Sequence, residues 1–174
     1  MSGANPISTL YFSRNGLLEP LGQSQVMAYL RGLSRDYKIT LITYEKPEDW
    51  ANSEAMTQAR ADCQAHGINW RPKRFRHRPK LLAPAWCMFE MFWSALQAAR
   101  RRDAELIHAR SYLPAAAAWA VNRLTGTPFI FDMRALWLEE LITAGRLQRG
   151  SIVHKVLTRL EKVCLRDAAA VVSL

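Results

Sequence analysis

The chain alternates between short runs of β-branched and aromatic residues and longer helical patterns, and this alternation limits its fold more than any other feature. Runs with the composition of strands cover residues 7–13, 37–44, 68–71, 105–109, 128–132 and 169–174. Segments with helical periodicity or many alanines lie between them, at 22–35, 48–66, 85–101, 114–124 and 151–166. Strands joined by helices of this length form βαβ units, so the sequence predicts one Rossmann-like α/β domain over residues 1–174, with a parallel sheet covered by helices on both faces.

Ligands of such sheets bind beyond the carboxyl ends of the strands, so the residues that follow each strand are the candidates for a functional site. After the first strand, Gly22, Gln23 and Ser24 stand at the start of a helix, where free N–H groups and the helix dipole favour a phosphate. A plain helix-capping loop is the alternative. The chain has neither G-x-G-x-x-G nor G-x-x-x-x-G-K-[ST], which disfavours a Rossmann-type oxidoreductase.

Three polar residues, His108, Arg110 and Ser111, stand at or just after the end of the fourth predicted strand. A neutral imidazole at this place can accept a proton or bind a sugar hydroxyl, and a guanidinium can hold phosphate with two parallel hydrogen bonds. The alternative is structural: His108 is a half-buried histidine satisfied by its neighbours, and Ser111 caps the next helix.

Charged residues follow the fifth predicted strand: Asp132, Arg134 and the pair Glu139 and Glu140, which lies in a helix predicted to begin near residue 135. Arg134 can pair with Asp132 or with Glu139. A cluster of this kind can order a loop, and it can also shift pKa values at a functional site. A structural and a functional interpretation of these residues are therefore both retained.

The segment 71–80 is strongly basic, with Arg or Lys at six of its ten positions: Arg71, Lys73, Arg74, Arg76, Arg78 and Lys80. The aromatic-rich helix that follows contains Trp86, and its polar positions Glu90, Ser94 and Gln97 form only a narrow stripe. Basic residues beside such a helix suit an anionic membrane surface or a lipid-linked acceptor. A solvated loop before an ordinary core helix is the alternative, and nucleic acid is a third reading. The net charge of +9 fits any anionic partner.

The other features argue against several classes of protein. Cys63, Cys87 and Cys164 lie far apart and form no C-x-x-C pair, which disfavours a disulfide framework and a zinc site and fits a reducing compartment. The first residues lack the pattern of a secretory signal, and the longest apolar stretch, 81–99, is interrupted by polar residues and Pro, so it is a poor transmembrane span. We therefore expect a cytoplasmic protein. Because an apolar strand stands at residue 174, we also expect a second domain to follow.

Four segments together resemble the N-terminal domain of family-4 glycosyltransferases: 16–47 (GLLEPLGQSQVMAYLRGLSRDYKITLITYEKP), 107–115 (IHARSYLPA), 128–140 (PFIFDMRALWLEE) and 159–174 (RLEKVCLRDAAAVVSL). They occur in the family's order and at its usual spacing. The chain departs from the pattern in its single glycine in the first loop, in Ala135 where a glycine is common, and in Glu139-Glu140 where Asp-Glu is frequent.

The resemblance implies the N-terminal half of a GT-B fold, in which two Rossmann-like domains face each other across a cleft. The nucleotide-sugar donor would be held mainly by a C-terminal domain with an E-x7-E motif, which this chain lacks. The donor-phosphate loop maps onto Gly22 and Gln23, and a histidine near the reacting centre maps onto His108. Family members usually retain the anomeric configuration and need no metal or other cofactor.

On this basis we expect the acceptor-side half of a retaining hexosyltransferase that is inactive alone. Its acceptor would be a glycan or a lipid-linked acceptor of cell-envelope polysaccharide synthesis, and the protein would be peripheral on the inner face of the cell membrane. A non-catalytic membrane-docking or partner-binding module is the alternative. Nucleic acid is the least favoured partner.

Overall fold

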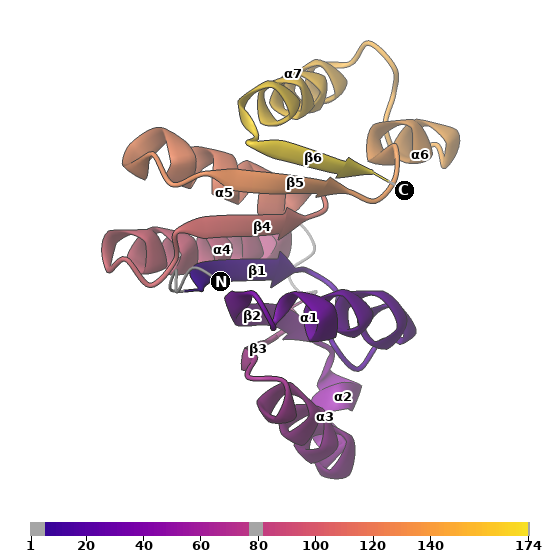
Figure 1. The fold of residues 1–174 in the computed structure, drawn as a ribbon. Coiled ribbons are helices and arrows are strands. Elements are labelled where there is room, and N and C mark those ends of the chain that lie inside the picture. Colours follow the sequence, from indigo (N-terminus) through magenta and orange to yellow (C-terminus); the bar gives the residue numbers. More distant parts are fainter. Residues whose placement is uncertain (1–5, 77–81, 174) are drawn as a thin grey trace.

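The computed structural model of the chain describes residues 6–76 and 82–173, which form a six-stranded sheet with helices on both faces (Figure 1). All neighbouring strands are parallel, and their order is β3-β2-β1-β4-β5-β6. The strands are β1 (Ile7–Ser13), β2 (Tyr37–Glu45), β3 (Asn69–Arg74), β4 (Leu106–Arg110), β5 (Phe129–Met133) and β6 (Ala170–Ser173). The predicted Rossmann-like α/β fold is therefore confirmed.

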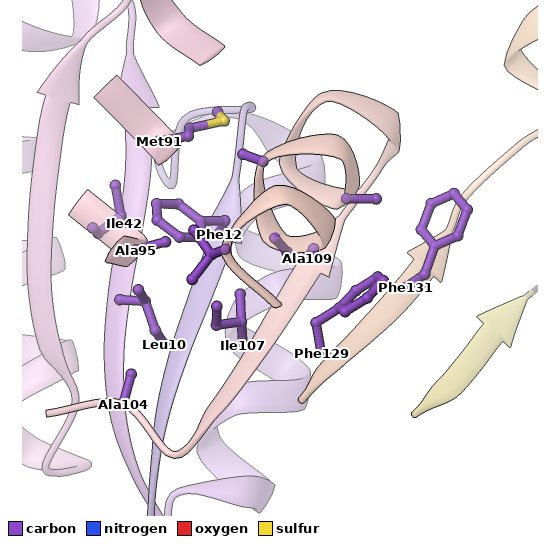
Figure 2. Packing of buried hydrophobic residues seen from close by; sticks show 14 of the residues in the cluster. Leu10, Phe12, Ile42, Met91, Ala95, Ala104, Ile107, Ala109, Phe129 and Phe131 are labelled. Carbon is purple, nitrogen blue, oxygen red and sulfur yellow. The ribbon is translucent and has the colours of Figure 1, made fainter. Parts of the chain in front are cut away.

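One face of the sheet packs against α4 (Leu82–Arg100), α5 (Tyr112–Thr125) and α7 (Ile152–Asp167). Alternate residues of the strands point to this face, so Phe12, Ile107 and Phe129 enter one buried cluster with Met91 of α4 (Figure 2). Four consecutive alanines of α5 are buried as well, at positions 115–118. Their small side chains let the helix lie close to the sheet.

The opposite face of β1, β2 and β3 is covered by η1 (Gly22–Met27), a π-helical segment, which continues into α1 (Ala28–Leu33), and by α3 (Ser53–Ala65). In Figure 1, α1 lies in front of the sheet and α4 and α5 lie behind it. Tyr11, Leu41 and Trp70 belong to this second buried cluster, together with Met27 and Leu30 of the helices. The two remaining helices are α2 (Pro47–Ala51) and α6 (Trp137–Thr143).

Two sequence-based boundaries need correction. The single helix predicted over 48–66 is wrong, because the chain breaks at Asn52, whose side-chain oxygen accepts the Ala55 N–H and caps α3. The third strand runs to Arg74 instead of residue 71, since its ladder with β2 continues to Glu45. Pro72 is tolerated because β3 stands at the edge of the described sheet. Helix α3 is followed by Gly67, whose left-handed φ of 67° is typical of the residue that ends a helix.

Candidate functional site

The candidate site lies at the carboxyl ends of β1, β4 and β5, where the strand order reverses between β1 and β4. The register places Arg110 of β4 beside Ser13 of β1 and beside Asp132 of β5. His108 lies two residues before Arg110, beside Tyr11. Residues two apart on a strand share a face, so the fold alone brings these polar side chains together on one face of the sheet.

The carboxylate of Asp132 is the centre of this cluster. Asp132 is only 3% exposed. Its oxygens lie 3.6 Å from His108 Nε2, 3.9 Å from Arg110 Nη1 and 4.0 Å from Arg134 Nη1. Arginine side chains stay protonated in proteins, so two positive charges face one negative charge. The cluster therefore has a surplus of positive charge, which suits an anionic ligand.

Gln25, which sequence reasoning did not select, joins the two arginines. Its side-chain oxygen accepts a hydrogen bond from Arg110 Nη2 at 2.5 Å and another from Arg134 Nη2. Gln25 lies within the π-helical segment η1, and π-helical turns are frequent at functional sites. The sequence signal that could have found it is the pair of arginines at the ends of adjacent strands, since guanidinium groups that are buried or half-buried require an acceptor.

The ring of His108 is fixed by stacking on Tyr11, with 4.4 Å between the ring centroids and 26° between their planes. Burial raises the pKa of Tyr11 to about 12, an effect that the nearby Arg110 guanidinium opposes. Within the described part of the chain, His108 Nε2 and Arg110 Nη1 are buried atoms without a hydrogen-bond partner. Buried polar atoms are usually bonded, so these two nitrogens, both near the Asp132 carboxylate, retain capacity for a ligand.

An apolar cavity of about 260 Å³ adjoins the cluster on the same face of the sheet. His108 and Asp132 are among its polar lining residues. The other lining residues include Thr9, Tyr29, Ile39, Leu106, Ile130 and Val172. The face of β4, β5 and β6 on this side therefore offers apolar surface immediately beside the charged cluster.

Gly22, Gln23 and Ser24 make local contacts. A Cβ at Gly22 would lie 2.3 Å from the carbonyl oxygen of Gly16, so this glycine permits close packing of the helix on the preceding turn. The Gln23 side chain donates to the Leu17 carbonyl at 2.9 Å, and the Ser24 hydroxyl donates to the Pro20 carbonyl at 2.7 Å. The backbone N–H of Gln23 is bonded to the carbonyl of Glu19. The predicted contact of this segment with a donor phosphate stays a prediction.

Glu45, a second residue that the sequence did not mark, holds the same turn in place. Its fully buried carboxylate accepts the backbone N–H groups of Leu17 at 2.7 Å and Leu18 at 3.3 Å, and the hydroxyl of Thr43 at 2.5 Å. Charge-assisted bonds of this kind are stronger than neutral ones. The turn that precedes η1 is therefore fixed to the carboxyl end of β2.

Ser111 has a strained backbone, with φ at 78° and ψ at 174°, a conformation that is essentially limited to glycine. Its side chain makes no cap hydrogen bond to α5, in contrast to the alternative that it caps the helix. Its N–H donates to the Asp132 carbonyl at 2.8 Å instead. Strain of this kind clusters at functional sites, and here it lies next to Arg110.

Glu139 and Glu140 are exposed on α6. Glu139 pairs with Arg149 at 2.5 Å, whereas Arg134 lies near Asp132. In the described residues, no hydrogen bond or ion pair connects either glutamate to the Asp132 cluster. The structure thus brings together His108, Arg110, Asp132 and Arg134, and its contacts do not extend that cluster to the two glutamates.

The described part of the basic segment begins in β3, the edge strand of the sheet. Arg71 and Lys73 line a polar cavity of about 290 Å³ beside α4, and Arg74 lies over the Trp50 ring at 5.3 Å. Arg76 lies over the ring of Trp86 at 5.5 Å. Arg78 and Lys80 lie outside the described residues.

The described residues were also compared with the requirements of a membrane span and of a metal site. None of their helices has the length and apolar composition needed to span a bilayer. Nor do three or more His, Cys, Asp or Glu side chains come together among them in a group that could hold a metal ion.

Comparison with known proteins agrees with the fold. A family model described as a glycosyl transferase 4-like domain matches residues 22–174, which is most of the chain. The chain belongs to the glycosyl transferase 4-like family. This glycosyl transferase 4-like domain is also similar in fold to the crystal structure of Anabaena HepE in complex with UDP and glucose, with a TM-score of 0.53 and 12% identity. The match covers 95% of this chain and 37% of the HepE chain, and a search of curated proteins gave no match.

Proposed function

We propose that this domain is the acceptor-side half of a retaining GT-B hexosyltransferase, which moves a sugar from a nucleotide-sugar donor to a glycan or a lipid-linked acceptor of the cell envelope. The donor is held mainly by a second domain, so this chain alone is inactive. The observation that carries the proposal is the convergence of two arginines and His108 on the buried carboxylate of Asp132, at the switch point of a glycosyl transferase 4-like domain.

The two arginines supply the charge that this reaction needs. When the glycosidic bond to the donor breaks, negative charge develops on the departing diphosphate, and fixed cations stabilise it. Arg134 is the more accessible of the two, with a side chain 16% exposed compared with 7% for Arg110. Arg134 therefore contacts the phosphate, and the more deeply buried Arg110 adds to the positive electrostatic potential at the site. Because arginines provide this charge, the transfer proceeds without a metal or another cofactor.

His108 serves the acceptor. His108 lines the open cavity, and its buried Nε2 has no hydrogen-bond partner in the described residues, so a small displacement of the ring would present this nitrogen to a sugar hydroxyl there. Asp132, 3.6 Å away, and the stacked ring of Tyr11 limit the orientations of the imidazole. A histidine held in this way can accept a hydrogen bond or a proton from the acceptor hydroxyl.

A binding experiment tests the anion site without requiring turnover. We expect pyrophosphate and UDP to shift the side-chain NMR signals of Arg110 and Arg134 in the purified chain, and uridine, which lacks the phosphates, to leave them unchanged. Arg134→Ala should abolish the shifts. Arg149→Ala is the matched control, because its guanidinium pairs with Glu139 away from the cluster. Equal responses to uridine and UDP, or unchanged pyrophosphate binding in Arg134→Ala, would contradict the proposal.

A transfer assay tests the division of labour between the two halves. We expect no release of UDP from UDP-glucose when residues 1–174 are incubated with glycan acceptors. We likewise expect no release of inorganic phosphate when glucose 1-phosphate replaces UDP-glucose. Sugar transfer by this chain alone would show that the donor site is complete within it. That result would overturn the assignment of donor binding to a second domain.

A further inference from the structure

One face of helix α4 exposes three large aromatic side chains to solvent. Trp86, Phe89 and Trp93 of α4 are 46%, 54% and 47% exposed, although the other side of the same helix is buried in the core through Cys87 and Met91. The three rings form a continuous row, with centroid distances of 5.9 Å and 6.3 Å between successive rings. Contiguous apolar patches of this kind mark interaction sites in soluble proteins.

Basic side chains border this aromatic row. Arg76 lies over Trp86, and Arg71 and Lys73 of β3 line a cavity with the polar flank of α4. Arg100, in the last turn of α4, is exposed as well. The acidic groups near the row are Glu90, which is partly buried on α4, and Asp103, which lines the same cavity as the basic pair. The cations therefore outnumber the acids around the face.

We propose that the aromatic row of α4 and its basic border dock this domain on an anionic lipid bilayer. Tryptophan and phenylalanine lie favourably at the boundary between headgroups and acyl chains, and arginine and lysine bind anionic headgroups. Nucleic acid fits less well, since bases stack on free ring faces, whereas here Phe89 stacks on Trp93 and Arg76 covers Trp86.

The position of the row relates docking to the site. Because β3 is parallel to its neighbours and leads into α4, the start of this helix lies at the carboxyl end of the sheet, the end that carries the Asp132 cluster. An apolar groove of about 120 Å³ continues from Met88 of α4 to Tyr112, Leu113 and Trp137. The aromatic row and the Asp132 cluster lie on opposite faces of the sheet, so docking by α4 orients the shared carboxyl end of the sheet relative to the membrane without placing the cluster against it. This inference deepens the membrane part of the proposed function, but it does not rest on the chemistry of the site.

Vesicle co-sedimentation with the 174-residue chain tests the proposal. We expect binding to vesicles of phosphatidylcholine with about one third phosphatidylglycerol, weaker binding as salt is raised, and little binding to pure phosphatidylcholine. The triple change W86S, F89S, W93S should weaken binding by about tenfold or more, because the apolar insertion is lost. The matched control is I152S with V156S on α7, which removes aliphatic side chains that are 81% and 60% exposed without touching α4.

A second variant and a second readout keep the proposal open to refutation if the triple variant folds poorly. R71Q and K73Q should each weaken binding by about fivefold, whereas R166Q, an exposed arginine on α7, should not. Brominated lipids should quench the tryptophan emission of the wild-type chain, and W86F with W93F should remove most of that quenching.

Three outcomes would overturn the docking proposal. These are failure of the wild type to bind anionic vesicles at low salt, equal binding by the α4 and α7 variants, and tighter binding to single-stranded oligonucleotides. None of these readouts needs sugar transfer, so they are separable from a failure of the proposed activity.

Discussion

Two glycines in the first helical region should respond to alanine with opposite signs. A Cβ at Gly22 would lie 2.3 Å from the Gly16 carbonyl oxygen and 2.5 Å from that of Leu17, whereas a Cβ at Gly32 meets nothing within 4 Å. Alanine in a helix gains about 0.5–1 kcal/mol over glycine, so Gly32→Ala should stabilise the domain by about that amount. At Gly22 the same gain is opposed by a clash with backbone atoms, which a side-chain rotation cannot relieve.

The cost at Gly22 follows from what must move. To make room, the 16–17 turn has to shift away from η1, which strains the 2.7 Å bond from the Leu17 N–H to the buried Glu45 carboxylate. A hydrogen bond to a charged group is worth about 1.5–3 kcal/mol, and overpacking costs about 1–3 kcal/mol. After the propensity gain is subtracted, Gly22→Ala should lower the free energy of unfolding by about 1.5–5.5 kcal/mol.

Urea unfolding followed by circular dichroism measures both variants against the wild type, at constant m so that the midpoints report stability. The reasoning requires the midpoint of Gly22→Ala to fall and that of Gly32→Ala to rise. If Gly22→Ala is as stable as the wild type, the backbone contact does not constrain this position, and the packing explanation for the glycine is wrong.

Three further outcomes follow from the structure. Ser111→Gly should raise the free energy of unfolding by about 1–2 kcal/mol, because it relieves the backbone strain; Ser111→Ala, measured by the same urea titration, should give no such gain. Burial raises the pKa of Cys63 and of Cys164 to about 12 in the folded state. A raised folded pKa gives stability that is complete below the unfolded value of 9.0, so urea midpoints should fall as pH rises from 9 towards 12; a midpoint that stays flat up to pH 11 would contradict this. Asp132→Ala should destabilise the domain by about 3–5 kcal/mol, since two guanidinium groups lose their carboxylate, and pyrophosphate should restore part of the melting temperature; a loss that the anion does not reduce would argue against the charge surplus.

The sequence predicts most of the fold because its hydrophobic periods are clear. Strands such as 37–44 have the composition of a buried ladder, and the rule that ligands gather at carboxyl ends selected His108, Arg110 and Asp132, which the structure brings together. That rule works because the register of a parallel sheet aligns strand ends without any knowledge of side-chain contacts.

The residues that sequence reasoning missed depend on long-range geometry. Gln25 reaches the arginines from a π-helical turn, and hydrophobic periodicity does not register a single extra residue in a helix. Glu45 at the end of a strand is expected to be solvated, but the chain folds Leu17 and Leu18 over it. The helix break at Asn52 is equally hard to predict, because a side-chain cap at this residue and a continuous helix through it differ little in free energy.

The π-helical turn has a consequence for how this domain tolerates length changes. A chain one residue shorter between Gln25 and Ala28 would wind as a regular α-helix, and the side chains before the deletion would turn by about 100° relative to α1. Leu30 would keep its place in the core, but the carboxamide of Gln25 would swing away from both guanidinium groups. Deletion of one residue here would therefore leave a folded domain in which Gln25 no longer bridges Arg110 and Arg134.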